Sequence, residues 1–209
     1  MSVDPRYRIC LVTDRGLARG RSQIDIALAA VAGGATMIQL REKDLATRAF
    51  IEEARALRDR LAPLGVPLII NDRADVALAV DADGLHVGQD DMPYATARAL
   101  LGPGKIIGLS ITAPDQLDAG DARAADYLGI GPIFAQATKA DASPPLGLDG
   151  LSAARRLTDR PLMAIGGIHA GNAGDLRRAG ADGLAIVSAI VAADDPGAAT
   201  REIAAAFGA

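Results

Sequence analysis

A short polar stretch at residues 39–44 has the residue types and spacing that most directly suggest chemistry. It reads Gln-Leu-Arg-Glu-Lys-Asp and follows an apolar run over residues 35–38. A buried parallel strand is apolar along its length, so this change to charged residues marks the end of a strand. In extended backbone, Gln39, Arg41 and Lys43 point the same way, which predicts an anion-binding site. A solvated strand-to-helix loop is the alternative interpretation.

Two carboxylates follow later apolar runs. Asp72 comes after residues 67–70, and Asp91 comes after residues 84–87. Paired carboxylates with few His or Cys nearby suit Mg²⁺, which takes one or two carboxylates together with water and phosphate oxygens. Positive charge from Arg41, Lys43 and Lys139 beside this ion favours a diphosphate ligand over a monophosphate. Each aspartate could instead cap the helix that follows it.

A second anion site is predicted from residues near the end of the chain. Gly166-Gly167 allows a ligand to approach the backbone closely, and Val187-Ser188 opens a short helical turn whose N–H groups can bind one phosphate. The sequence therefore predicts a metal-bound diphosphate and a separate phosphate in one site.

Such a site needs a scaffold that brings several strand ends together. Strands are predicted at 8–12, 35–38, 67–70, 84–87, 105–109, 127–130, 161–165 and 183–187. Helical segments alternate with them at 22–31, 47–61, 74–80, 93–101, 114–119, 148–157, 172–179 and 196–207. This alternation is typical of an α/β fold of the (β/α)8 TIM-barrel type, whose active site is built from the loops after the strands. We expect a single TIM-barrel domain over residues 1–209, with a doubly wound sheet as the alternative.

A weak internal recurrence favours the closed barrel. Short similar segments lead into every second strand, at Gly34-Ala35-Thr36, Ala82-Asp83-Gly84, Ala125-Asp126-Tyr127 and Ala181-Asp182-Gly183. A recurrence at every second βα unit fits a closed fourfold arrangement. Similar helix-to-strand connections that arose independently would give the same pattern.

Composition restricts the classes of partner. Half of the 209 residues are hydrophobic but only 3% are aromatic, so the core must be aliphatic, as in packed parallel strands and helices. A net charge of −4 provides no basic surface for nucleic acid or an anionic membrane. The lone Cys10, in an apolar run, is expected in the core of a protein from a reducing compartment. With no signal-peptide core and no membrane-spanning run, we expect a cytoplasmic protein.

The motifs of this chain resemble those of the thiamine-phosphate synthase family along essentially its whole length. The similar stretches are residues 11–14, 39–43, 71–72, 86–91, 131–134, 138–139, 166–168 and 181–183. The resemblance implies a Mg²⁺-dependent transferase that joins 4-amino-2-methyl-5-(diphosphooxymethyl)pyrimidine to 4-methyl-5-(2-phosphoethyl)thiazole, giving thiamine phosphate and diphosphate. It implies these two phosphorylated small molecules as partners and leaves a homo-oligomer open.

The resemblance also assigns expected roles by position. It implies that the pyrimidine diphosphate is bound by Gln39, Arg41, Lys43, Asn71, Ser110 and Lys139, with Asp72 and Asp91 as magnesium ligands. It implies that the thiazole phosphate is bound by position 136, Thr138, Gly167, Val187 and Ser188. The residues expected to act in catalysis are Arg41, Lys43, Lys139 and Ser110. The family usually has threonine at position 136, whereas this chain has Gln136, a longer amide that can still hydrogen-bond a phosphate.

The dissociative mechanism of the family requires stabilisation of the leaving diphosphate and no general base. This agrees with the presence of only two histidines, of which we interpret His86 as interior packing and His169 as a loop residue. A related thiazole tautomerase is one alternative, but it has a histidine where this chain has Thr112, and it lacks the Gln-Leu-Arg-Glu-Lys stretch. A non-catalytic protein that binds a thiamine precursor is a second alternative, suggested by Gln136.

Overall fold

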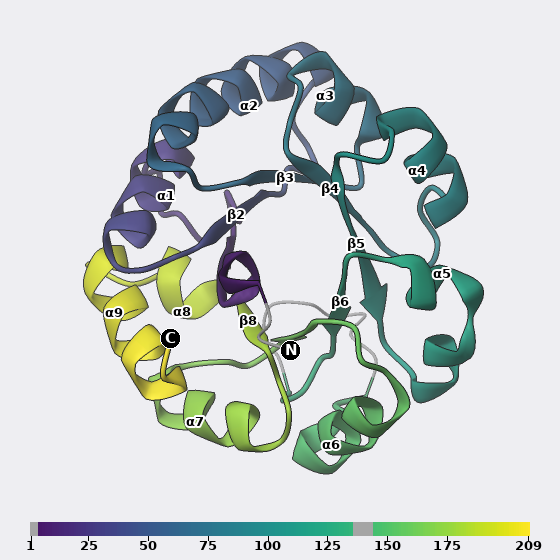
Figure 1. Cartoon of the computed structure of the whole chain (residues 1–209). Helices are drawn as coiled ribbons and strands as arrows, with labels where there is room; N and C mark the ends of the chain where they lie inside the picture. The colour runs from purple at the N-terminus through teal and green to yellow at the C-terminus, as the bar shows by residue number, and fades with distance from the viewer. Residues whose placement is uncertain (1–3, 136–143) are drawn as a thin grey trace.

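The computed structural model describes residues 4–135 and 144–209, which form a closed barrel of eight parallel strands inside a ring of helices (Figure 1). The strands are β1 (Ile9–Val12), β2 (Met37–Leu40), β3 (Leu68–Asn71), β4 (Gly84–Val87), β5 (Ile106–Ile111), β6 (Tyr127–Ile130), β7 (Leu162–Ile165) and β8 (Gly183–Ile186). Each strand pairs with its neighbours in the sequence, and β1 pairs with β8 in the register Ile9 to Leu184. The predicted TIM barrel is confirmed, and the doubly wound sheet is excluded.

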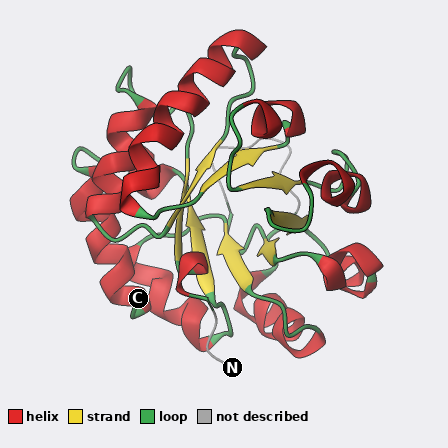
Figure 2. Ribbon diagram, turned by 45° about the horizontal axis from the view of Figure 1, so that its top comes forward, coloured by secondary structure: helices red, strands yellow, loops and turns green. Residues whose placement is uncertain are grey.

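The helices lie outside the barrel (Figure 2). They are α1 (Gln23–Ala32), α2 (Thr47–Leu61), α3 (Ala74–Ala79), α4 (Tyr94–Leu101), α5 (Gly120–Ala124), α6 (Gly147–Leu157), α7 (Ala170–Arg178), α8 (Ser188–Val191) and α9 (Pro196–Phe207), with 3-10 turns η1 (Pro5–Tyr7), η2 (Ala62–Leu64) and η3 (Pro114–Asp118). The C-terminal α9 packs against both α1 and α7, which closes the outer ring (Figure 1). Among the described residues, no helix has the length and apolar character needed to cross a membrane.

Three predicted helix boundaries were wrong for local reasons. The helix expected at 114–119 is the turn η3 followed by α5, because Ala119 adopts an extended conformation between them. Pro93 precedes α4 as its N-cap residue and is not its first helical residue. Helix α7 starts before Asn172, because the His169 ring accepts a hydrogen bond from Gly171 N (3.2 Å) and caps the helix there.

Both faces of the strands are buried, as the aliphatic composition predicts. One set of alternate residues faces the helices, and the other fills the barrel together with Tyr7 of η1, as a cluster of Cys10, Val12, Met37, Ile69, Ile106, Tyr127, Met163 and Ala185. The rings of Tyr7 and Tyr127 lie 5.4 Å apart between centroids, so η1 closes one end of the barrel interior. In Figure 1 this turn is the purple coil within the ring of strands. Cys10 is a core residue as expected, and burial raises the pKa of its thiol to about 12.

The recurrent segments before the even-numbered strands bind the N-terminal ends of the odd-numbered strands. In each, one side-chain oxygen accepts a hydrogen bond from a backbone N–H of the preceding strand. The bonds run from Leu68 N to Asp83 Oδ2 (2.8 Å), from Ile107 N to Asp126 Oδ2 (2.7 Å), from Leu162 N to Asp182 Oδ2 (2.9 Å) and from Ile9 N to Thr36 Oγ1 (3.0 Å). An N–H at the strand end is thus satisfied once in every two βα units, which gives the recurrence a physical cause.

The carboxylate of Asp182 also binds Arg155 of α6, at 2.7 Å. Replacing Asp182 by alanine should lower the free energy of unfolding by roughly 2 kcal/mol, because the buried Leu162 N–H loses its acceptor and Arg155 loses its partner. Urea unfolding of the two proteins measures this difference. Asp159, an exposed aspartate in the loop before β7, provides the control. Equal losses in the Asp182→Ala and Asp159→Ala variants would contradict the assigned role.

Candidate active site

The predicted ligand-binding residues that the structure describes lie where the strands end, on one face of the barrel. Side chains alternate along a strand, so residues an even number of positions beyond the interior cluster also face inward. Three predicted site residues face inward by this rule, because each lies two or four positions after a residue of the interior cluster. They are Gln39 after Met37, Asn71 after Ile69, and Ser110 after Ile106. The barrel therefore brings together side chains that are separated by up to 71 positions in the sequence.

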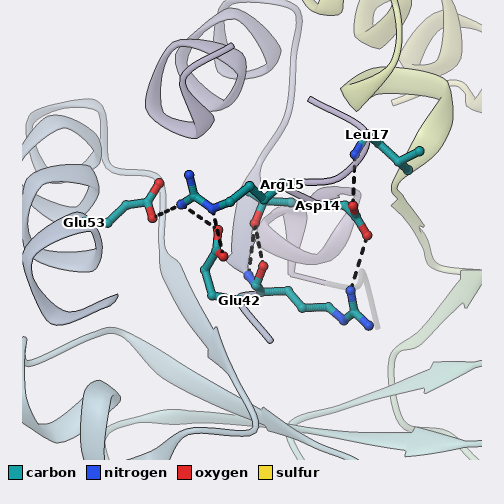
Figure 3. Close-up of polar contacts among 7 residues, drawn as sticks. Asp14, Arg15, Leu17, Glu42 and Glu53 are labelled. Atoms are coloured by element: carbon teal, nitrogen blue, oxygen red, sulfur yellow. Dashed lines mark hydrogen bonds and ion pairs between the residues drawn. The ribbon is translucent and has the colours of Figure 1, made fainter. Parts of the chain in front are cut away.

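Arg41 is held by the loop that follows β1, in which Asp14 and Leu17 are hydrogen-bonded to each other (Figure 3). Its backbone N–H donates to Thr13 Oγ1 at 3.0 Å, and Thr13 N donates to Gln39 O at 3.0 Å. The Arg41 guanidinium donates to Asp14 Oδ2 at 3.3 Å, while Asp14 Oδ1 accepts from Leu17 N at 3.1 Å. Asp14 thus orients a guanidinium that is only 24% exposed.

Glu42, in the same stretch, has a structural partner. Its carboxylate is 2% exposed and lies 2.9 Å from the guanidinium of Arg15, which also pairs with Glu53 of α2 (Figure 3). This ion-pair network joins the loops after β1 and β2 to α2. The extended geometry expected through Lys43 does not continue that far, because β2 ends at Leu40 and the chain bends over residues 43–45. Lys43 itself is exposed.

Asp72 and Asp91 lie close together at the ends of β3 and β4. Asp72 has a φ of +61°, which Asp and Asn tolerate better than most residues, and its N–H donates to His86 O at 2.8 Å. Burial and the neighbouring Asp91 raise the pKa of Asp72 to about 6, and Arg41 partly offsets this rise. Asp91 Oδ2 accepts from Gly88 N at 2.8 Å. Two carboxylates that repel each other in this way suit a bound divalent cation.

The available donor set fits Mg²⁺ better than zinc. Over residues 4–135 and 144–209, no three or more His, Cys, Asp or Glu side chains converge on a common metal position. Structural zinc sites usually take four protein ligands and catalytic ones three. Mg²⁺ binds through one or two carboxylates and completes its shell with water and substrate phosphates. Asp72 and Asp91 match the second pattern.

His86 is buried, as expected, but it does more than fill space. Its Nδ1 lies 2.9 Å from the Tyr127 hydroxyl, and its Nε2 lies 2.9 Å from Ser110 Oγ. Burial lowers the pKa of His86 to about 4, so the ring is neutral at pH 7. The Ser110 carbonyl accepts from Gln89 Nε2 at 2.6 Å. Ser110 is therefore connected to a polar chain that continues into the barrel.

The predicted phosphate-binding residues lie after β7 and β8. Gly167 has a φ of +65°, and a Cβ there would lie 2.7 Å from the Cβ of Phe134, so a side chain does not fit. Val187 is the half-buried N-cap residue of α8, and Ser188 is its exposed first residue. The remaining predicted site residues, Gln136, Thr138 and Lys139, lie outside the described residues.

Sequence reasoning did not assign a role to Asp14, which contacts Arg41, or to Tyr127, which is linked to Ser110 through His86. Asp14 follows the first strand directly, and this position was a usable signal. Tyr127 is at the start of a strand, far from the strand ends that form the site. Its signal is the pair of glycines inside neighbouring strands, Gly108 and Gly129, because glycine within a strand often marks a close approach of another group.

The chain is similar to proteins of one enzyme family over nearly its full length. The sequence profile of a family described as thiamine monophosphate synthase matches residues 9–190. A thiamine-phosphate synthase from Chloroflexus aurantiacus is 57% identical over 197 residues, which cover 94% of this chain and 91% of the relative. One from Albidiferax ferrireducens is 55% identical over 189 residues, covering 90% and 86%. The solved thiamine phosphate pyrophosphorylase from Pyrococcus furiosus superposes with a TM-score of 0.89 at 35% identity, covering 98% of this chain and 96% of that chain. This chain therefore belongs to the thiamine monophosphate synthase family.

Proposed function

We propose that this protein joins 4-amino-2-methyl-5-(diphosphooxymethyl)pyrimidine to 4-methyl-5-(2-phosphoethyl)thiazole, releasing diphosphate and forming thiamine phosphate. The observation that carries the proposal is the placement of Arg41 beside the Asp72 and Asp91 carboxylates at the mouth of the barrel. A divalent cation and a fixed positive group together suit a diphosphate, and this part of the site offers two carboxylates that would hold the cation and a guanidinium as the fixed group. Membership of the family makes the pyrimidine diphosphate the ligand to test.

Asp72 and Asp91 would hold Mg²⁺, which when bound supplies positive charge to the oxygens of the leaving diphosphate. Arg41 contributes a guanidinium whose orientation is set in advance by Asp14. Preorganised charge of this kind stabilises a transition state more than a mobile side chain does, because no reorganisation is needed during the reaction. In this proposal, Lys43 and Lys139 add further positive charge to the bound diphosphate.

The proposed reaction has two bond changes and no proton transfer. The bond between the pyrimidine methylene carbon and the diphosphate oxygen breaks, and its electron pair leaves with the diphosphate. The ring amino group stabilises the resulting pyrimidine-methyl cation. The thiazole nitrogen then donates its lone pair to this carbon and forms the new bond. A neutral His86 is compatible with this route, because no base has to remove a proton.

The second substrate is held by its own phosphate in this proposal. Gly167, Val187 and Ser188, across the mouth from the carboxylates, would bind that phosphate together with Gln136 and Thr138. Fixing the thiazole by a group remote from its nitrogen lowers the entropic cost of bringing the two rings together. Catalysis would then combine charge stabilisation of the leaving group with proximity of the nucleophile.

Replacing Arg41 by alanine should lower kcat/KM by at least about 100-fold, because one preorganised positive group is lost from the leaving-group site. The assay supplies both substrates and Mg²⁺, oxidises the product and records thiochrome-type fluorescence. Arg48, exposed on α2, is the matched control, and the Arg48→Ala variant should keep wild-type kinetics. Binding of both substrates without any turnover by the wild-type protein would contradict the proposed function.

The carboxylate pair predicts a pH-dependent effect on stability in protein treated with EDTA. The pKa of Asp72 is about 6 in the folded protein against 3.8 for an unperturbed aspartate. The unfolded chain therefore loses this proton first, and the folded state loses stability as the pH rises from about 4 to 6. Asp72→Asn removes the effect, so the Tm of the variant minus that of the wild type should grow over this range and then level off.

Differential scanning fluorimetry from pH 4 to 8 measures this difference. Asparagine also tolerates the positive φ at this position, so the substitution introduces no backbone strain. Asp90→Asn, at an exposed neighbouring residue, is the control. Added Mg²⁺ should raise the Tm of the wild type at pH 7.5 and leave that of Asp72→Asn unchanged. A Tm difference that is constant with pH would show that Asp72 is not destabilised in the folded state.

A further inference from the structure

We propose that Tyr127 and His86 act as a positioning pair that makes Ser110 a hydrogen-bond donor toward the substrate. The inference rests on the proposed function, since Ser110 lies at the diphosphate side of the site. The three groups form a continuous chain from the barrel interior to the site face, with Tyr127 Oη 2.9 Å from His86 Nδ1 and His86 Nε2 2.9 Å from Ser110 Oγ. Tyr127 is 2% exposed and His86 is 8% exposed, so water does not surround either link.

The burial of Tyr127 determines which group donates and which accepts along this chain of hydrogen bonds. Its hydroxyl lies in a cluster made mainly of apolar residues, including Cys10, Met37 and Met163, and a buried hydroxyl proton needs an acceptor. Within the described part of the structure, the acceptor at hydrogen-bond distance from this hydroxyl is His86 Nδ1. A neutral imidazole that accepts at Nδ1 carries its proton on Nε2. His86 therefore donates to Ser110 Oγ, and the Ser110 proton is free to point to the ligand.

The opposite direction would change what Ser110 offers. If His86 carried its proton on Nδ1, Ser110 would donate to Nε2 and could only accept from a ligand. The ionised oxygens of a diphosphate ester accept hydrogen bonds, so a group that binds them must be a donor. The direction imposed by Tyr127 matches the chemistry of the leaving group.

Three further observations indicate that the barrel is built around these two rings. A Cβ on Gly108 would lie 2.1 Å from Cζ of Tyr127, and one on Gly129 would lie 3.0 Å from Cε1 of His86. Glycine weakens a strand, so its presence at both positions is explained by the space the rings need. The rings are stacked, with centroids 5.5 Å apart. Burial raises the pKa of Tyr127 well above its usual value, and Gln39, on the site side, partly lowers it.

The tautomer of His86 can be measured directly, because the chain contains only two histidines. We expect ¹⁵N spectra of histidine-labelled protein to show His86 protonated on Nε2, with the His169→Asn variant used to assign the signals. Tyr127→Phe should give a mixture of both tautomers. It should also lower kcat/KM for the pyrimidine diphosphate by about tenfold, the factor expected for one lost buried hydrogen bond, and leave the KM of the thiazole phosphate unchanged.

Tyr7→Phe is the matched control, because Tyr7 is a buried tyrosine in the same interior cluster whose ring contacts Tyr127. It should preserve both the His86 tautomer and the kinetics. The double variant Tyr127→Phe/Ser110→Ala should be no slower than Ser110→Ala alone, because the pair acts through the serine hydroxyl. If the role of Tyr127 were purely structural, the fold losses in kcat/KM of the two single variants would instead multiply in the double variant.

Protonation of His86 on Nδ1 in the wild-type protein would overturn the inference, and so would a Tyr127→Phe variant with wild-type kinetics. Magnesium diphosphate serves as the probe of the link to the site, and it should shift the His86 signals of the wild type. If magnesium diphosphate does not shift these signals, His86 does not sense ligand at the site, and this result would also contradict the inference. A protein that shows the Nε2 tautomer and this shift but no synthase turnover would support the positioning role of Tyr127 and His86 and reject the proposed function. Failure of the inference and failure of the proposed function can therefore be distinguished.

Discussion

Closure of the barrel by pairing of β1 with β8 is the constraint on which the rest of the structure depends. Once the strands form a closed barrel, alternate side chains of every strand point into one shared interior, and the C-terminal ends of all strands lie on the same face. The two ends of the barrel then have different tasks. At the N-terminal end, the carboxylates of Asp83, Asp126 and Asp182 satisfy backbone groups. At the C-terminal end, carboxylates of the same residue type are left to face each other.

The electrostatics of the C-terminal face follow from that difference. The pKa of Asp72 is raised by burial and by Asp91, whereas Arg41 is already oriented by Asp14. The protein thus maintains an excess of negative charge in one place and a fixed positive group beside it. In the proposed function, a metal ion and a diphosphate would relieve both features at once. The buried pair of His86 and Tyr127 adds a neutral component, which orients a hydroxyl without introducing further charge.

Sequence reasoning recovered the fold and most of the residues at the strand ends, because both depend on local patterns. Apolar runs interrupted by turn residues identify strands, and the barrel then requires their polar ends to meet. Sequence reasoning failed where contacts between residues distant in the sequence determine the role of a residue. Glu42 lies within the predicted anion-binding stretch, and its partner, Arg15, lies 27 positions earlier, so the sequence pattern does not reveal the ion pair. His86 has the burial expected of packing, and only the approach of Tyr127 from β6 reveals its hydrogen bonds. The position of α5 likewise depends on one extended residue, Ala119, that propensity does not identify.

The central claim is that Asp72 and Asp91 would hold a metal ion that binds the leaving diphosphate together with Arg41. Isothermal titration calorimetry of the wild-type protein with inorganic diphosphate, in EDTA and in Mg²⁺, tests this claim most directly. The account predicts that Mg²⁺ tightens binding by about 100-fold, and that most of this gain is lost in Asp91→Asn. Equal affinity with and without Mg²⁺ would contradict it.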